Sequence, residues 1–244
     1  MNWSTILISA FIFSQIGLFP TSIYLHRTLA HRAITLHKSI DVLMRALLWM
    51  TTGVISKEWV AVHRKHHTYT DKPEDPHSPL QLGFWNVQLG NYYYYRKEIA
   101  NKKTIETFSA DIYQDKFDKL LFNHWKTGIL IGITIMCATI GIINGIIAWI
   151  IGVILYIILS STINGLCHAK GYKNYPNTSA TNIRTVALIT AGEALHNNHH
   201  GKPTSPKFSH KWHEIDPSWP IIKILTILNL AKTMPIPTLE EVGN

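Results

Sequence analysis

Residues 192–200 read GEALHNNHH, and the His-x-x-His-His spacing in this stretch occurs a second time, as HRKHH at residues 63–67. On a helix, the first and fifth positions of such a box lie about 40° apart, so their rings point the same way. The fourth position lies about 60° to the other side of the first. Each box therefore offers two rings to one metal ion and one ring to another, and two facing boxes predict a centre for two metals.

This geometry also assigns the rings within each box. His63 and His67 are expected to act together, while His66 crosses over to the second metal. The later box is expected to repeat the pattern, with His199 as the ring that crosses over.

Two long stretches, residues 1–26 and 127–169, contain no Asp, Glu, Lys or Arg. Uncharged runs of this length are typical of membrane spans, which need about 20 apolar residues. The sequence predicts three membrane-spanning helices, near residues 3–25, 127–143 and 146–168.

The basic residues orient these spans. Arg27 and Arg32 follow the first span and no Lys or Arg precedes it, which places His26 at the cytoplasmic surface. Two further crossings return the chain to the same side at His168. The expected localisation is an inner membrane of the bacterial type, with the His boxes on the cytoplasmic side.

The remaining segments are expected to lie on or below that surface. Residues 34–56 place Lys38, Asp41 and Arg45 on one helical face, which predicts an interfacial helix, and residues 219–231 predict another. The predicted fold is therefore an all-α integral membrane protein in one domain, residues 1–244, whose cytoplasmic helical cap holds the His boxes.

A third histidine pair, His26 and His31 in HRTLAH, is separated by five residues. Five residues along an α-helix correspond to about 140° of rotation, so the two rings would not share a face. The membrane helix is therefore expected to end here, with a change in the direction of the backbone.

The formal charge of +8 comes from Lys and Arg that are scattered through the polar segments. This distribution fits retention of those segments on the cytoplasmic side and argues against nucleic acid as a partner. The two cysteines, Cys137 and Cys167, form no motif and predict no disulfide framework.

The topology gathers nine histidines, and a set of neutral imidazoles suits iron, copper or zinc better than magnesium or calcium. Three carboxylates near the boxes, Glu58, Asp75 and Glu193, are candidates to orient the ligand rings. Asn164, one helical turn before His168, is a candidate to hold a metal-bound water. The other histidines, His77 among them, are assigned to the surface or the core. The nine candidate ligands are His26, His31, His63, His66, His67, His168, His196, His199 and His200.

The motifs HRTLAH, EWVAVHRKHHTYTDKPEDPH, NGLCHAKGY and GEALHNNHH resemble those of the membrane fatty acid desaturases of the stearoyl-CoA desaturase type, in the same order along residues 26–200. The resemblance implies an O2-dependent oxidoreductase of lipid metabolism that introduces a double bond into a fatty acyl chain. It implies a CoA-linked acyl substrate, with Δ9 as a candidate position, and no catalytic group beyond the metal ligands. It also implies two Fe2+ ions, one bound by His26, His31, His63, His67 and His199 and the other by His66, His168, His196 and His200, with Asn164 acting through water.

The sequence departs from that family in three places. One span precedes the first box, where the family usually shows two, and Ala194 stands where glycine is common. No cytochrome b5 domain is fused to the chain, so a separate ferredoxin or cytochrome is expected to supply electrons.

Two other interpretations use the same histidines. A di-iron membrane hydroxylase or ketolase acting on alkyl or isoprenoid chains would differ in the step after the first hydrogen is removed, although the four-residue gap in HRTLAH favours a desaturase. A membrane metal sensor or carrier would spread its histidines along a path and would not depend on O2.

Overall fold

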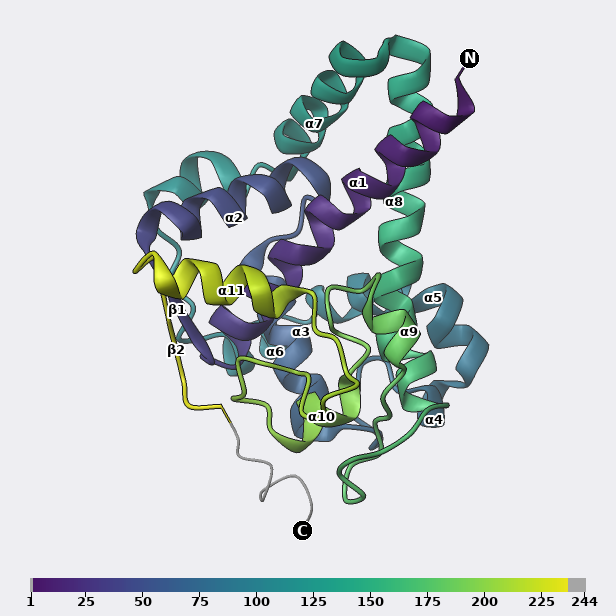
Figure 1. Cartoon of the computed structure of the whole chain (residues 1–244), viewed down its shortest axis with the longest axis vertical. Helices are drawn as coiled ribbons and strands as arrows, with labels where there is room; N and C mark the ends of the chain where they lie inside the picture. Colours follow the sequence, from purple (N-terminus) through teal and green to yellow (C-terminus); the bar gives the residue numbers. More distant parts are fainter. Residues whose placement is uncertain (1, 237–244) are drawn as a thin grey trace.

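The computed structural model describes residues 2–236 and is mostly helical. Its upper half consists of three long helices (Figure 1): α1 (Trp3–Pro20), α7 (Trp125–Ile140) and α8 (Ile142–Asn164). The lower half is a cap of short helices and loops, which contains all the histidine boxes. The predicted domain boundaries reach residues 1 and 237–244, which lie outside the described residues.

Two helices are long and apolar enough to cross a membrane, Trp3–Ala30 and Ile142–His168, and they contain the predicted spans near 3–25 and 146–168. The predicted span near residues 127–143 corresponds to α7. This helix has 16 residues, fewer than the roughly 20 that a perpendicular crossing needs. A third candidate span is the pair Lys38–Thr51 and Ser56–Tyr69, bent by 90°. The described chain therefore has two to three candidate spans, as expected for this fold class.

The helix predicted over residues 34–56 forms over a shorter range than expected. The segment instead forms the strand β1 (Ile34–Leu36), the helix α2 (Lys38–Thr51) and the start of α3 (Ser56–Tyr69). The break contains Gly53 at φ +63, a backbone conformation that side chains disfavour. The turn at Gly53 directs α3, and with it the first His-x-x-His-His box, into the cap.

Small residues set how closely the long helices approach. A Cβ on Gly152 of α8 would lie 2.7 Å from the Phe13 ring of α1. A Cβ on Gly132 of α7 would lie 2.1 Å from the Met50 carbonyl oxygen of α2. Helices in membranes approach closely where such residues face each other. Consequently α8 packs along α1, while the first turns of α7 pack on α2.

The cap is closed by its own short elements. The strands β1 and β2 (Ala231–Thr233) pair antiparallel, with Ile34 opposite Thr233. The apolar stretch predicted as an interfacial helix over residues 219–231 forms the helix α11 and then reaches β2. The remaining elements are α4 (Pro79–Leu82), α5 (Phe84–Ile99), α6 (Lys102–Phe108), η2 (Asp118–Phe122), η3 (Leu166–His168), α9 (Arg184–Ala187), α10 (His196–Gly201) and α11 (Ser218–Ile227).

Candidate metal centre

The first histidine pair lies on a π-helix, η1 (Thr21–Ala30), which continues α1 without a break. The amide of His31 donates to the carbonyl oxygen of His26 at 3.1 Å, the i to i+5 bond of this geometry. Residues five apart therefore share a face, and the two ring centroids lie 5.0 Å apart. The expectation that the two rings would not share a face was wrong, because the wider turn replaces the about 140° separation of an α-helix; the helix does end within this motif, at Ala30.

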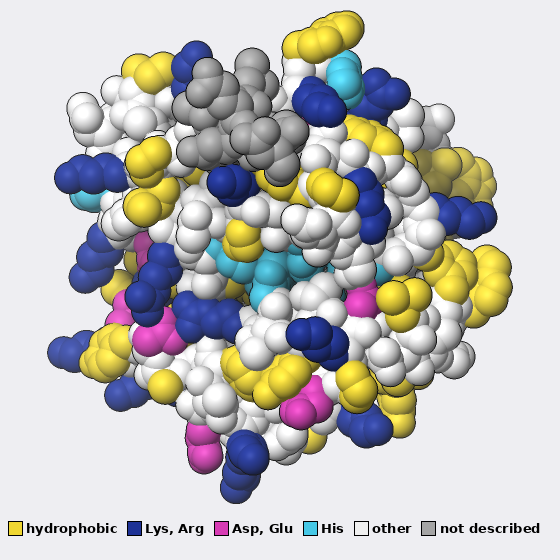
Figure 2. All heavy atoms as spheres, turned by 90° about the horizontal axis from the view of Figure 1, so that it is seen from below, with side chains coloured by type: hydrophobic (Ala, Val, Ile, Leu, Met, Phe, Trp, Pro, Cys, Tyr) yellow, Lys and Arg dark blue, Asp and Glu magenta, His cyan; other side chains and the backbone are white. Residues whose placement is uncertain are grey.

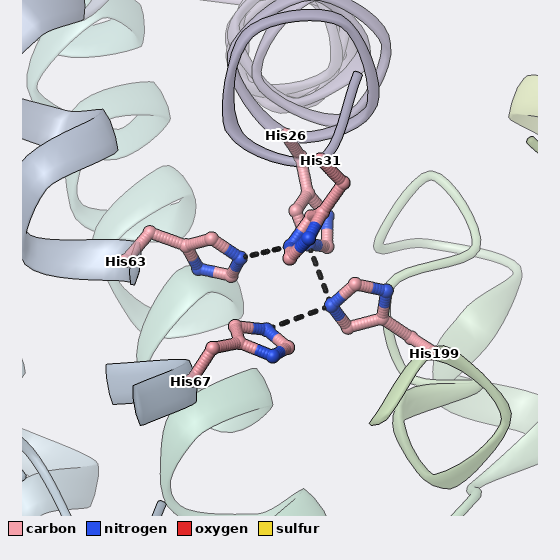
Figure 3. Close-up of side chains that lie close together, drawn as sticks. All are labelled: His26, His31, His63, His67 and His199. Carbon is pink, nitrogen blue, oxygen red and sulfur yellow. Dashed lines mark hydrogen bonds between the residues drawn. The ribbon is translucent and has the colours of Figure 1, made fainter. Parts of the chain in front are cut away.

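Five histidines converge at the lower end of this helix (Figure 3), and their ligand nitrogens all lie within 4.8 Å of one another. His26 and His31 come from η1, His63 and His67 from α3, and His199 from α10. The Nε2–Nε2 distance is 2.9 Å for His26 and His199, 2.8 Å for His31 and His63, and 2.9 Å for His67 and His199. These rings form the five-histidine group.

A second set, the four-histidine group, has its ligand nitrogens within 4.8 Å of one another. It consists of His66, His168, His196 and His200. Nε2 of His200 lies 3.3 Å from Nε2 of His66 and 3.1 Å from that of His196. In each box the first and fifth rings share one group and the fourth joins the other. The structure therefore places the nine rings in the two sets that the sequence predicts as ligand sets, although their role as ligands stays a prediction.

Carboxylates fix the orientation of three of these rings. Nδ1 of His26 lies 2.5 Å from Glu193, Nδ1 of His66 lies 2.9 Å from Asp75, and Nδ1 of His168 lies 2.8 Å from Asp71. A ring that donates from Nδ1 presents a lone pair at Nε2, the form that binds a metal.

Nε2 of His168 is buried and has no hydrogen-bond partner within residues 2–236. Together with the clustering of imidazole nitrogens at short distances, this unpaired acceptor fits a transition metal at each group. The donor set contains nitrogen alone, which does not suit magnesium or calcium.

The protonation states agree with this interpretation. Burial lowers the pKa of His196, His199 and His200 well below the usual value, so these rings are neutral. Burial alone would raise the pKa of the Asp71 carboxyl, but its hydrogen bond and charge interaction with His168, together with hydrogen bonds from Ser179 and Ser78, outweigh burial and hold that pKa well below its usual range. Neutral imidazoles beside ionised carboxylates are the state in which histidine binds metals.

The predicted orienting carboxylates lie in different places. Asp75 and Glu193 contact ligand-group rings, as their positions near the boxes suggested. Glu58 has no hydrogen bond to any of the nine rings and lies in the wall of a cavity. Sequence reasoning missed Asp71, whose signal is its place in the same turn as Asp75: the Asp71 amide donates to the Asp75 carboxylate at 2.8 Å.

His77 was assigned to the surface or core, and the structure buries it beside the four-histidine group. Its ring centroid lies 4.7 Å from that of His66, and neither of its nitrogens has a hydrogen-bond partner in the part of the chain that the structure describes. His77 also lines a cavity that lies next to the two histidine groups. The dipeptide Pro76–His77 directly after Asp75 was the signal for this placement.

A cavity of about 620 Å³ runs from the two histidine groups into the half of the molecule that contains α1, α7 and α8. His26, His63 and His196 lie in its wall, and so does Asn164, whose amide donates to Asn91 at 3.1 Å. One face of α8 forms a long apolar side of the cavity through Trp149, Val153, Tyr156 and Ile157. The 15 helical steps from Trp149 to Asn164 correspond to about 22 Å of helix. A long apolar ligand therefore fits beside the metals.

The opposite side of the centre approaches the polar surface of the cap. Figure 2 shows histidine side chains in a depression at the middle of this face, with Lys and Arg side chains around it. His31, His67 and His200 are the partly exposed members of the two groups. The centre is thus reached by an apolar cavity on one side and by a basic polar face on the other.

Comparison with known proteins agrees with the resemblance of the sequence motifs. The family model for fatty acid desaturase matches residues 2–223. The chain is 28% identical over 243 residues to Delta-9 acyl-lipid desaturase 2 of Arabidopsis thaliana, covering 97% of this chain and 76% of the relative. It is 30% identical to the acyl-CoA C20 Delta5-desaturase of Anemone leveillei, with 97% and 76% covered. It is also 30% identical to the sn-1 stearoyl-lipid 9-desaturase of Synechocystis sp., with 100% and 76% covered.

Proposed function

The chain belongs to the fatty acid desaturase family and is a membrane-bound fatty acyl desaturase, and from this premise we propose that it works with two iron ions held by the nine histidines. The observation that supports this most is the partition of nine imidazoles into groups of five and four with converging Nε2 atoms. A hydroxylase or ketolase activity is not favoured, since the matched relatives are desaturases.

The metal ions would supply the oxidising power, with O2 and two electrons, that removal of hydrogen from an unactivated methylene requires. The chain's own residues do the rest. Trp149, Tyr156 and Ile157 hold the acyl chain in an apolar cavity, and His26 and His196 bring the ligand groups to its wall. A fixed cavity sets which carbons face the metals, and position in such a site is worth large factors in rate.

We further propose that Asn164 acts on the four-histidine metal through a bound water. Asn164 lies in the cavity wall, one helical turn before His168. Its amide group donates to Asn91, which leaves the side-chain oxygen to accept from water.

The electron donor is proposed to be a separate ferredoxin or cytochrome that acts from the cytoplasmic side. The partly exposed rings of His31, His67 and His200 support entry of electrons through the polar face of the cap. The Arg27 and Arg32 residues that follow the first span support a cytoplasmic location for that face, in a bacterial-type inner membrane.

For the acyl carrier we propose CoA, with Δ9 as the candidate position. Arg96 lies in the cavity wall at the end of α5, and Lys97, Lys102 and Lys103 follow closely in the chain. Cations at this end of the cavity suit a phosphate-bearing carrier. The relatives are named for both acyl-CoA and acyl-lipid substrates, so purified enzyme would be given each form in turn.

The test of the function is lipid analysis of host cells that express the protein, with the double-bond position determined by mass spectrometry. We expect new unsaturated acyl chains, none with His199→Ala, and an unchanged product with His210→Ala. His210 is a buried histidine outside both groups, 3.0 Å from the Tyr175 hydroxyl. A hydroxylated product without a new double bond, or unchanged lipids with the protein confirmed in the membrane, would contradict the proposal.

A further inference from the structure

The five-histidine group rests on a buried chain of charged residues that reaches away from the metals. Glu193 contacts Nδ1 of His26 at 2.5 Å through Oε2 and accepts from Arg27 at 3.3 Å through Oε1. The second arm of the Arg27 guanidinium donates to Asp216 at 2.9 Å. Arg27 is 0% exposed, Glu193 5% and Asp216 4%. A ligand ring is thus connected to Asp216, near the end of the cap, through two intermediates.

The neighbours of Asp216 hold it as a carboxylate. Its oxygens accept from Arg27, from the Phe208 amide at 2.8 Å and from the Ser218 amide at 3.1 Å. Burial raises the pKa of Asp216, but a protonated acid would need an acceptor, and its described partners are all donors. Two carboxylates therefore share one guanidinium.

The three charged residues Glu193, Arg27 and Asp216 are closely packed against their neighbours. The Arg27 guanidinium lies 3.6 Å from the centroid of the Phe208 ring, which also contacts the His26 and His199 rings. A Cβ on Gly192 would lie 2.2 Å from Oδ1 of Asp216. Because these contacts hold the series Glu193–Arg27–Asp216 in place, a change of charge at one end affects the other end. Small movements of the side chains do not absorb it.

The four-histidine group is supported differently. Its carboxylates, Asp71 and Asp75, contact His168 and His66 directly. Neither has an ion pair with Lys or Arg within residues 2–236. The five-histidine group depends instead on a single carboxylate, Glu193, which also forms an ion pair with Arg27.

From these contacts we infer that Asp216 is a positioning residue for the five-histidine metal. By competing with Glu193 for Arg27, it keeps Glu193 a strong acceptor for the His26 Nδ1–H and so keeps His26 a strong ligand. This inference rests on the proposed assignment of the two histidine groups as metal sites.

The test is a Co2+ titration of chelator-treated, detergent-purified protein, followed by calorimetry. The binding event lost in His31→Ala identifies the five-histidine group, and the event lost in His168→Ala identifies the four-histidine group. We expect Asp216→Asn to weaken the first event about 10-fold, the lower end of the range for outer partners of metal ligands, and to leave the second unchanged.

Asp118→Asn is the matched control, because Asp118 is also buried and paired with a buried arginine, Arg45, but contacts no ligand histidine. It should change neither event. Transmission through Glu193 also predicts that Asp216→Asn has little further effect in a Glu193→Gln background.

If Asp216→Asn does not yield folded protein, Arg27→Lys takes its place in the same cycle, since lysine cannot bridge two carboxylates as a planar fork does. Two binding events that weaken alike, or an Asp216→Asn effect that persists fully without Glu193, would overturn the inference while leaving the metal sites intact. Absence of two metal-binding events in the unmodified protein would overturn the proposed function as well.

Discussion

The tautomers of three ligand-group rings are set by carboxylates at Nδ1, the ring atom on the far side from the clustered Nε2 atoms. Asp71 contacts Nδ1 of His168 and Asp75 contacts Nδ1 of His66, so the Nε2 atoms of both rings carry lone pairs. The hydrogen bonds between the Asp71 amide and Asp75, and between Ser78 and Asp71 at 2.6 Å, place both carboxylates in one turn. A single turn after α3 therefore orients two rings of the four-histidine group.

The variant Asp71→Asn tests this role. The amide side chain could still accept from His168, but without a charge, so we expect the four-histidine metal to bind about 10-fold to 100-fold more weakly and the five-histidine metal to be unaffected. Stepwise metal titration of the purified variant measures both. An equal loss at the two groups would instead indicate general damage to the cap.

A second residue-scale prediction concerns acid stability. Glu214 accepts from the Tyr172 hydroxyl and from Asn174, each at 2.7 Å, and from Asn198 at 2.7 Å. Burial acts to raise the pKa of Glu214, but hydrogen bonds from the Lys211 amide, the Tyr172 hydroxyl, the His210 amide and Asn174 together outweigh it and lower the pKa. A lowered folded pKa stabilises the protein above the unfolded value of about 4.3, and this stability is lost as the pH falls through the folded pKa.

The thermal unfolding temperature of Glu214→Gln should accordingly lie below that of the unmodified protein at pH 7, with the gap closing as the pH is lowered beneath about 4. Unfolding in detergent at several pH values measures this. A gap that stays constant across that window would show that the charge of Glu214 has no part in stability.

At the scale of the elements, the path of α7 leaves room for the acyl cavity. The first turns of α7 pack on α2 through Gly128 and Gly132, while α8 packs along α1 through Gly152. Trp125 and Ile129 of α7 and Trp149 and Val153 of α8 all line the cavity, so both helices contribute to its wall. The loop at Gly53 and the helix α5 complete the wall, so the packing of α7 and α8 sets only part of the width of the cavity.

Trp149 lies furthest along α8 from Asn164 among the cavity-lining residues of that helix. We therefore expect Trp149→Ala to lengthen the apolar end of the cavity and to shift the products towards longer acyl chains. The chain-length profile of unsaturated products, measured by gas chromatography, checks this.

Ile150→Ala is the matched control, because Ile150 is the next residue on α8, is 45% exposed and does not line the cavity. The same shift in both variants, or none with Trp149→Ala, would contradict a role for Trp149 at the end of the cavity.

At the scale of the whole molecule, the net positive charge and the partly exposed histidines of the centre both bear on the approach of an electron donor. The chain has a formal charge of +8, and Lys and Arg side chains surround the depression in which histidines are visible (Figure 2). A positive face around a redox centre accelerates the approach of an acidic donor protein, and salt screens this effect over about 10 Å at 0.1 M.

Reduction of the enzyme by an acidic ferredoxin should therefore slow by about 10-fold or more between low salt and about 0.5 M salt. Stopped-flow measurement of the bimolecular rate checks this. A small neutral reductant should show little salt dependence in the same buffer. A ferredoxin rate that is independent of salt would place electron entry elsewhere on the molecule.

The sequence alone determined which residues could form the centre. Box spacing on an α-helix is a local property, so the partition of HRKHH and GEALHNNHH rings into pairs and crossing rings followed from helical geometry. The charge-free runs 1–26 and 127–169 likewise marked most of the long apolar helices at 3–30 and 142–168, because burial in lipid excludes charge.

Only the tertiary structure decided the rest. The π-helical turn that aligns His26 with His31 is sparsely populated and depends on packing around η1, so no local propensity predicts it. The contacts of Asp71 with His168 and of Asp216 with Arg27 join residues 97 and 189 positions apart. Spacing along a sequence carries no information about such pairs, because chain folding brings them together and low dielectric then makes their charges matter.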